Sequence, residues 1–126
     1  MATGLENLKV YCLSAELEIK VYNLTKQFPF DERYRSVDQL RRSSASVSNN
    51  IAESYHRRSL KEKTRILVDI AKAEAEETKR NLGVCYRKEF HKDSDIIDEY
   101  TSLIKMIGGY VRFLRKHISE TNEPMN

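Results

Sequence analysis

The sequence predicts an all-α fold, an antiparallel up-and-down four-helix bundle built as one domain of 126 residues. Only four glycines and two prolines are present, which favours long helices over turn-rich β structure. Apolar residues recur at steps of three and four in four stretches, with no strand pattern. The predicted helices cover residues 5–27, 32–56, 59–90 and 94–118, and we expect a disordered tail over residues 119–126.

The first predicted helix carries apolar residues on two neighbouring stripes. One stripe contains Leu8, Cys12, Ala15, Ile19 and Tyr22, and the other contains Leu13, Leu17, Leu24 and Phe28. Together they are wider than the roughly 100° of surface that faces a single core. The extra width indicates either central burial or a contact between subunits. Pro29 then ends the helix, because proline lacks a backbone donor and disfavours helical geometry in the preceding residue.

The second predicted helix has a thin apolar stripe and many small residues. Its stripe contains Val37, Leu40, Ser44, Val47, Ile51 and Tyr55. The serines of residues 43–48 would allow a neighbouring backbone to approach closely. Because serine is a poor helix former, we expect tertiary packing to hold this segment helical.

The third predicted helix begins at a capping box, in which Ser59 and Glu62 satisfy the first free amides. Steps of 100° per residue from Leu67 place Glu74 and Thr78 at the centre of its apolar arc. Glu74 is therefore a candidate buried polar residue. It could be a hydrogen-bonded structural carboxylate, a ligand or catalytic group, or a contact across subunits.

The fourth predicted helix is capped by Asp93 or Ser94 and has the most regular apolar spacing. Its heptad seam contains Ile97, Tyr100, Ile104, Ile107, Val111, Leu114 and Ile118. Basic residues in its last turns complement the negative end of the helix dipole. Ile96, Leu103 and Tyr110 add a neighbouring apolar stripe, which supports a subunit contact.

The motifs of common enzyme chemistry are missing from the sequence. There is no glycine-rich phosphate loop, GxSxG elbow or HExxH pair. A ferritin-like di-metal site needs two Glu-x-x-His pairs, and only Glu53 with His56 fits. Cys12 and Cys85 lie far apart and have no identifiable base. We therefore expect no enzyme activity, cofactor, metal site or small-molecule substrate.

The sequence also predicts a cytoplasmic protein that does not enter a membrane. No run of about 18 apolar residues is present for a membrane span. Residues 1–24 lack the basic start and apolar centre of a signal peptide.

Basic residues gather in the middle of the chain, although the net charge is only +3. Between Arg33 and Arg65 there are nine basic residues and three acidic ones. The candidate nucleic-acid-binding residues are Arg41, Arg42, Arg57, Arg58, Lys61 and Arg65. The alternative is a solvated basic face with ordinary ion pairs, such as Asp38 with Arg42 at i and i+4.

One long motif resembles the signature of a known family. Residues 39–53 read QLRRSSASVSNNIAE, and Arg57-Arg58-Ser59 follows. This pattern resembles the bacterial four-helix-bundle proteins encoded in intervening sequences of 23S ribosomal RNA genes. The similarity extends to residues 8–11, 24–26, 28–29, 32–34, 77 and 82, and covers most of residues 5–118. The chain differs in having Ser54 where the family usually has glycine, and Lys63 where an aromatic residue is common.

The resemblance implies a bacterial bundle protein, and related members assemble as rings of five. Related accessory proteins of diversity-generating retroelements are basic, bind nucleic acid and partner a reverse transcriptase. Two hypotheses follow. The first is a non-enzymatic homo-oligomeric bundle, as a pentamer or another closed assembly, that binds RNA or DNA through phosphate contacts. The second is a protein-interaction or structural adaptor that binds no nucleic acid.

Overall fold

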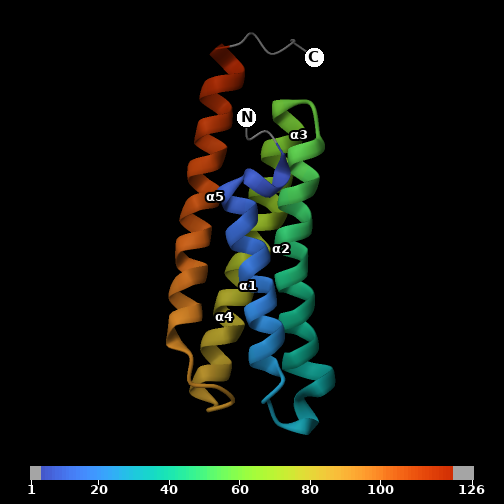
Figure 1. The fold of residues 1–126 in the computed structure, drawn as a ribbon, viewed down its shortest axis with the longest axis vertical. Helices are drawn as coiled ribbons and strands as arrows, with labels where there is room; N and C mark the ends of the chain where they lie inside the picture. The colour runs from blue at the N-terminus through green and yellow to red at the C-terminus, as the bar shows by residue number, and fades with distance from the viewer. Residues whose placement is uncertain (1–3, 121–126) are drawn as a thin grey trace.

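Four long helical segments run antiparallel to one another in the computed structural model, which describes residues 4–120 (Figure 1). They are α1 (Lys9–Thr25), α2 (Asp38–His56), the continuous segment α3 (Leu60–Arg65), η4 (Ile66–Lys72) and α4 (Ala73–Arg87), and α5 (Ser94–Glu120). Contacts join α1 to α2, α2 to α4, α4 to α5, and α5 to α1. The predicted four-helix bundle is confirmed, and no strand occurs within residues 4–120.

Helix α1 buries only part of its apolar surface, and Leu8 of the first stripe also packs against the core. Leu17 and Val21 are fully buried, and Phe28 is buried just after the helix. Ile19 and Tyr22, from the same first stripe, are 62% and 48% exposed. A 3-10 turn, Leu5–Asn7, precedes α1, so the regular helix is shorter than the predicted segment 5–27. The surplus apolar width of this helix therefore faces outward.

Helix α2 begins later than residue 32 because the chain first forms two irregular turns. A 3-10 turn, Phe30–Glu32, leads into a π-helical turn, Arg33–Val37, whose Tyr34 has non-helical dihedral angles. Ser44 and Ser54 of α2 are buried and donate to carbonyl oxygens of their own helix. The serine-rich face can pack closely against its neighbours because its hydroxyl groups are satisfied locally.

A π-helical turn, η4 (Ile66–Lys72), interrupts the third segment and changes which residues face the core. A π turn contains more residues than an α turn, so side chains beyond it are rotated from the positions that constant 100° steps give. Thr78 is fully buried, as expected, but Glu74 is only partly buried. The Thr78 hydroxyl lies 2.7 Å from the Ser43 hydroxyl of α2 and 2.7 Å from the Glu74 carbonyl oxygen.

Helix α5 closes the bundle with the longest apolar seam. Its buried residues include Ile96, Tyr100, Leu103, Ile107, Val111 and Leu114. The Asp93 carboxylate accepts from the Ile96 amide at 3.1 Å and so caps the helix. Ser119 and Glu120 belong to α5 rather than to the predicted tail, whose remaining residues, 121–126, lie outside the described residues. Within residues 4–120, no helix combines the length and apolar character that crossing a bilayer requires.

Candidate nucleic-acid interface

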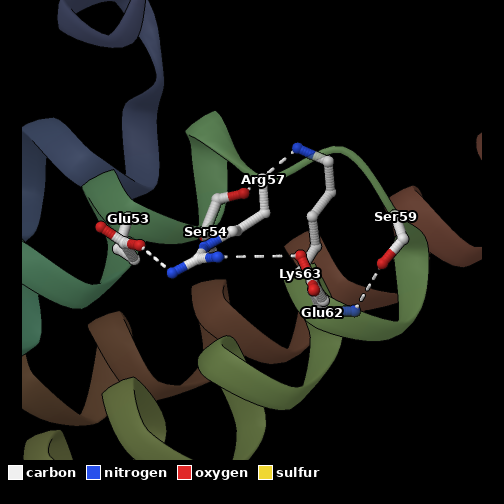
Figure 2. Close-up of polar contacts among 6 residues, drawn as sticks. All are labelled: Glu53, Ser54, Arg57, Ser59, Glu62 and Lys63. Atoms are coloured by element: carbon white, nitrogen blue, oxygen red, sulfur yellow. Dashed lines mark hydrogen bonds and ion pairs between the residues drawn. The ribbon is translucent and has the colours of Figure 1, made fainter.

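The corner between α2 and α3 consists of three residues, Arg57, Arg58 and Ser59. Arg57 and Ser59 have extended backbone angles, so the chain leaves one helix and enters the next within this short span. The Ser59 hydroxyl accepts a hydrogen bond from the Glu62 amide at 3.1 Å (Figure 2). The predicted serine cap thus fixes the start of α3.

Arg57 lies between two carboxylates, one from each helix (Figure 2). Its guanidinium group donates to Glu53, one turn earlier in α2. The other terminal nitrogen, Nη1, lies 3.9 Å from Glu62 Oε1 in α3. Two acidic partners offset the charge of Arg57, and its contacts join the two sides of the corner.

Lys63 holds the same corner from the opposite side (Figure 2). Its Nζ donates to the carbonyl oxygens of Ser54 and Tyr55, at 3.1 Å each. These oxygens belong to the last turn of α2, and that of Ser54 also accepts a hydrogen bond from the backbone N–H of Arg57 at 3.3 Å. Burial lowers the pKa of the Lys63 ammonium group from its usual 10.5. This role of Lys63 is not predictable from the sequence, because no local pattern relates a lysine in one helix to the end of the preceding one.

Arg58, Lys61 and Arg65 differ from Arg57 and Lys63. All three side chains are exposed, and within the described part of the chain none has a hydrogen bond or ion pair. Lys61 and Arg65 are four residues apart on α3, so they share a helix face. The corner thus presents three exposed cations on a backbone that other residues hold in place.

Arg41 is remote from this corner and packs against α1. At about 1.5 Å of rise per residue, it lies roughly 24 Å along α2 from Arg57. Its Nε donates to the Thr25 hydroxyl at 2.9 Å, and its guanidinium carbon lies 4.3 Å from the centre of the Tyr22 ring. Arg41 therefore links α1 to α2.

Arg42 lies on a different face of α2, beside acidic residues. Its Nε is 3.9 Å from Asp38 Oδ2, and it lines a shallow groove with Glu74 and Glu77 of α4. Burial, and then the charge of Glu77, raise the pKa of Glu74 from its usual 4.5. Of the six candidate residues, the structure groups Arg57, Arg58, Lys61 and Arg65 and places Arg41 and Arg42 elsewhere.

The C-terminal part of α5 adds cations at the same end of the bundle. Figure 1 shows the last turns of α5 at the end where α2 meets α3, and α3 contacts α5. Arg112, Arg115 and Lys116 are exposed there. Their sequence pattern predicts only an interaction with the helix dipole. The antiparallel topology could have located them, because the ends of the second and fourth long segments of such a bundle lie together.

The comparisons with known proteins agree with this architecture. A model of the family described as 23S rRNA-intervening sequence protein matches residues 6–109. The chain belongs to this family. Among solved structures, this member of the 23S rRNA-intervening sequence protein family resembles a protein from Bacteroides thetaiotaomicron VPI-5482. That protein is described as having unknown function and belonging to the S23 ribosomal protein family. The two are 27% identical, with a TM-score of 0.72, over 81% of this chain and 97% of that chain.

No curated protein matches the chain. The match to the 23S rRNA-intervening sequence protein family includes the whole α2–α3 corner, but it ends at residue 109. The exposed cations of α5 therefore lie beyond the matched residues. Among the described residues, no group of three or more His, Cys, Asp or Glu side chains is arranged to hold a metal ion.

Proposed function

We propose that this chain is a non-enzymatic, homo-oligomeric bundle that binds RNA or DNA through phosphate contacts. Arg58, Lys61 and Arg65 make these contacts at the α2–α3 corner. The observation that carries the proposal is that some cations at this corner are engaged in contacts and others are not. Arg57 and Lys63 are engaged in holding the backbone, whereas these three exposed cations have no partner within the described residues.

Exposed arginine and lysine side chains bind phosphates by displacing condensed counterions, a mechanism that needs no base-specific pocket. The backbone of the corner is held by the Ser59 cap, the Arg57 ion pairs and the Lys63 hydrogen bonds. A fixed backbone reduces the entropy that binding would otherwise cost. The corner is therefore suited to a polyanion of variable sequence.

The homo-oligomer rests on a different surface, the outward face of α1. Ile19 and Tyr22 are large apolar residues that remain exposed on one helix. The Tyr22 ring is partly covered by Arg41 of α2, and Ile19 lies one turn earlier on the same helix. An isologous or head-to-tail contact through this face would cover the apolar residues and multiply the cationic corners in one assembly. A protein adaptor could use the same face, and this is the second candidate function.

Charge reversal at the corner tests the proposed function. The variant Arg58→Glu/Lys61→Glu is compared with Arg35→Glu/Lys92→Glu, which makes the same net charge change at the opposite end of the bundle. Anisotropy of a labelled RNA oligonucleotide at low salt measures the affinity. We expect the corner variant to lose about tenfold or more in affinity, and the control to change far less. Equal losses in both variants, or no binding by the unmodified protein, would refute the proposal and leave the adaptor.

A further inference from the structure

The C-terminal part of α5 presents aromatic rings in a row. Tyr110, Phe113 and His117 are spaced by three and four residues, which places them on one face of the helix. The ring centres of Tyr110 and Phe113 are 6.5 Å apart, with 16° between the ring planes. The Phe113 and His117 ring centres are 4.1 Å apart. Phe113 is 53% exposed and His117 is also exposed, so the outer part of this aromatic row is open.

Cations flank the aromatic row. Arg112, Arg115 and Lys116 are exposed, and residues 110–117 contain no acidic residue. No ion pair in the described part of the chain involves these three cations. The segment therefore combines an exposed aromatic row with positive charge that no ion pair within the described residues offsets.

We infer that this aromatic row stacks with the bases of a single-stranded nucleic acid. Arg112, Arg115 and Lys116 contact the phosphates on either side, together with the cations of the α2–α3 corner. This inference rests on the proposed function and names its ligand class. Exposed aromatic rings next to cations bind single strands because every unpaired base offers a stacking face, whereas duplex bases are already stacked on one another.

The position of the row supports a continuous path for one strand. Contacts between α3 and α5 join the helix that carries Lys61 and Arg65 to the helix that carries the row. Both lie at the same end of the bundle in Figure 1. A second copy of the chain is a less suitable occupant, because it would bring the same cations and a net charge of +3 to this surface.

A tryptophan at position 113 tests the stacking directly. The chain contains no tryptophan, so Phe113→Trp introduces a single fluorophore at the row. Phe30→Trp is the matched control, because Phe30 is 78% exposed and also lies near an arginine, at the other end of the bundle. We expect an unlabelled poly-uridine oligonucleotide to quench Phe113→Trp and to leave Phe30→Trp nearly unchanged. A duplex of the same length should quench neither variant strongly.

A second variant measures the contribution of the ring to affinity. Phe113→Leu keeps an apolar, helix-compatible side chain and removes the aromatic face. We expect it to weaken single-strand binding about 5- to 100-fold and to change duplex binding less than about twofold.

The possible failures are distinguishable. If the protein binds single strands and Arg58→Glu/Lys61→Glu weakens that binding, but Phe113→Trp is not quenched, the inference is wrong and the proposed function stands. Emission that changes with protein concentration alone, and not with oligonucleotide, would show that a second copy covers the row, and would also overturn the inference. If the unmodified protein binds no nucleic acid, both fail.

Discussion

The Lys63 ammonium group of α3 donates a hydrogen bond to the Ser54 carbonyl oxygen of α2 across 3.1 Å. A second bond from the same nitrogen reaches the Tyr55 carbonyl oxygen. One side chain therefore contacts two carbonyl groups in the last turn of α2, and the Ser54 carbonyl also accepts a hydrogen bond from the Arg57 amide. Through these hydrogen bonds Lys63 joins α3 to the end of α2 beside Arg58, the residue proposed to bind phosphate, and the Lys63 ammonium group is itself engaged in doing so.

Replacing Lys63 by methionine should destabilise the protein. The apolar part of the side chain is kept, but two carbonyl groups lose a charged donor, so we expect a loss of about 1–3 kcal/mol in the free energy of unfolding. Urea denaturation followed by circular dichroism measures it. Lys61→Met is the matched control, because the Lys61 side chain is exposed and has no hydrogen bond or ion pair within the described residues, and it should change stability by less than about 0.5 kcal/mol. Equal stability of the two variants would contradict the capping role.

The buried hydroxyl pair of Thr78 and Ser43 should contribute to the packing of α4 on α2. Their oxygens are 2.7 Å apart, and both residues are buried. Thr78→Val removes the hydrogen-bond partner of the buried Ser43 hydroxyl. We expect this change to lower the free energy of unfolding by about 1–3 kcal/mol. The double variant Thr78→Val/Ser43→Ala should lose about 1 kcal/mol less free energy of unfolding than the sum of the losses in the two single variants.

Thr101→Val provides a control for the loss of a threonine hydroxyl. Thr101 is half-buried and donates only to a carbonyl oxygen of its own helix, at 3.3 Å. Thr101→Val should therefore lower the free energy of unfolding by less than Thr78→Val does. Strict additivity of Thr78→Val and Ser43→Ala would show that the two hydroxyls do not act as a pair.

The stability of the protein should depend on pH through Glu74. Its pKa is raised in the folded state, first by burial and then by Glu77, so the folded protein retains this proton to a higher pH than the unfolded chain does. This contribution to the free energy of unfolding therefore falls as the pH rises from about 4.5 through the folded-state pKa. Glu74→Gln should be more stable than the unmodified protein at pH 7, by a few tenths of a kcal/mol because the site is largely solvated.

The advantage of Glu74→Gln should disappear when unfolding is measured at about pH 3, where the Glu74 carboxyl is almost fully protonated in both states. Glu76→Gln, an exposed change two residues away, is the control. A variant that is less stable than the unmodified protein at pH 7 would show that the contacts of Glu74 with Arg42 and Ser46 outweigh its burial.

Assembly should depend on the outward face of α1. We expect light scattering to give a mass several times the 14.8 kDa of one chain, and Ile19→Glu to shift it toward the monomer, because a charge in the interface is costly to bury. Ile19→Val keeps the apolar character and should keep the assembly. If the unmodified protein is a monomer at micromolar concentration, the proposed homo-oligomer is wrong.

The sequence predicts the features that depend on local rules. The Ser59 cap, the burial of Tyr100, Ile107, Val111 and Leu114 in α5, and the end of the first helix before Pro29 follow from capping, periodicity and proline geometry. The predicted seam is wrong at Ile97 and Ile104, which are only partly buried, whereas Ile96 and Leu103 beside them are fully buried. The partial exposure of Glu74 does not follow, because the π-helical turn before it has no sequence signal as strong as a proline or glycine. A prediction from periodicity alone therefore treats such a turn as regular α-helix and misplaces the side chains that follow it.

The candidate site was predictable only in part, since charge density along the chain does not show which cations are already engaged. Arg41, Arg57 and Lys63 are equally basic in sequence, yet each contacts specific oxygens or carboxylates of a neighbouring segment. The partners of Arg41 and Lys63 lie in a preceding helix, at distances along the chain that no short motif spans. Arg112 and Phe113 lie near the corner only because α5 packs antiparallel in the bundle, and no local sequence pattern shows this.

The most direct test of the nucleic-acid interface is the salt dependence of single-strand binding by the unmodified protein. The apparent association constant for a labelled RNA oligonucleotide is measured over a series of salt concentrations, for this protein and for Arg58→Glu/Lys61→Glu. We predict that its logarithm falls linearly with the logarithm of salt concentration, with a slope of about −0.7 for each phosphate contact. The corner variant should show a shallower slope. A flat response, or the same slope in both proteins, would contradict a phosphate-binding corner.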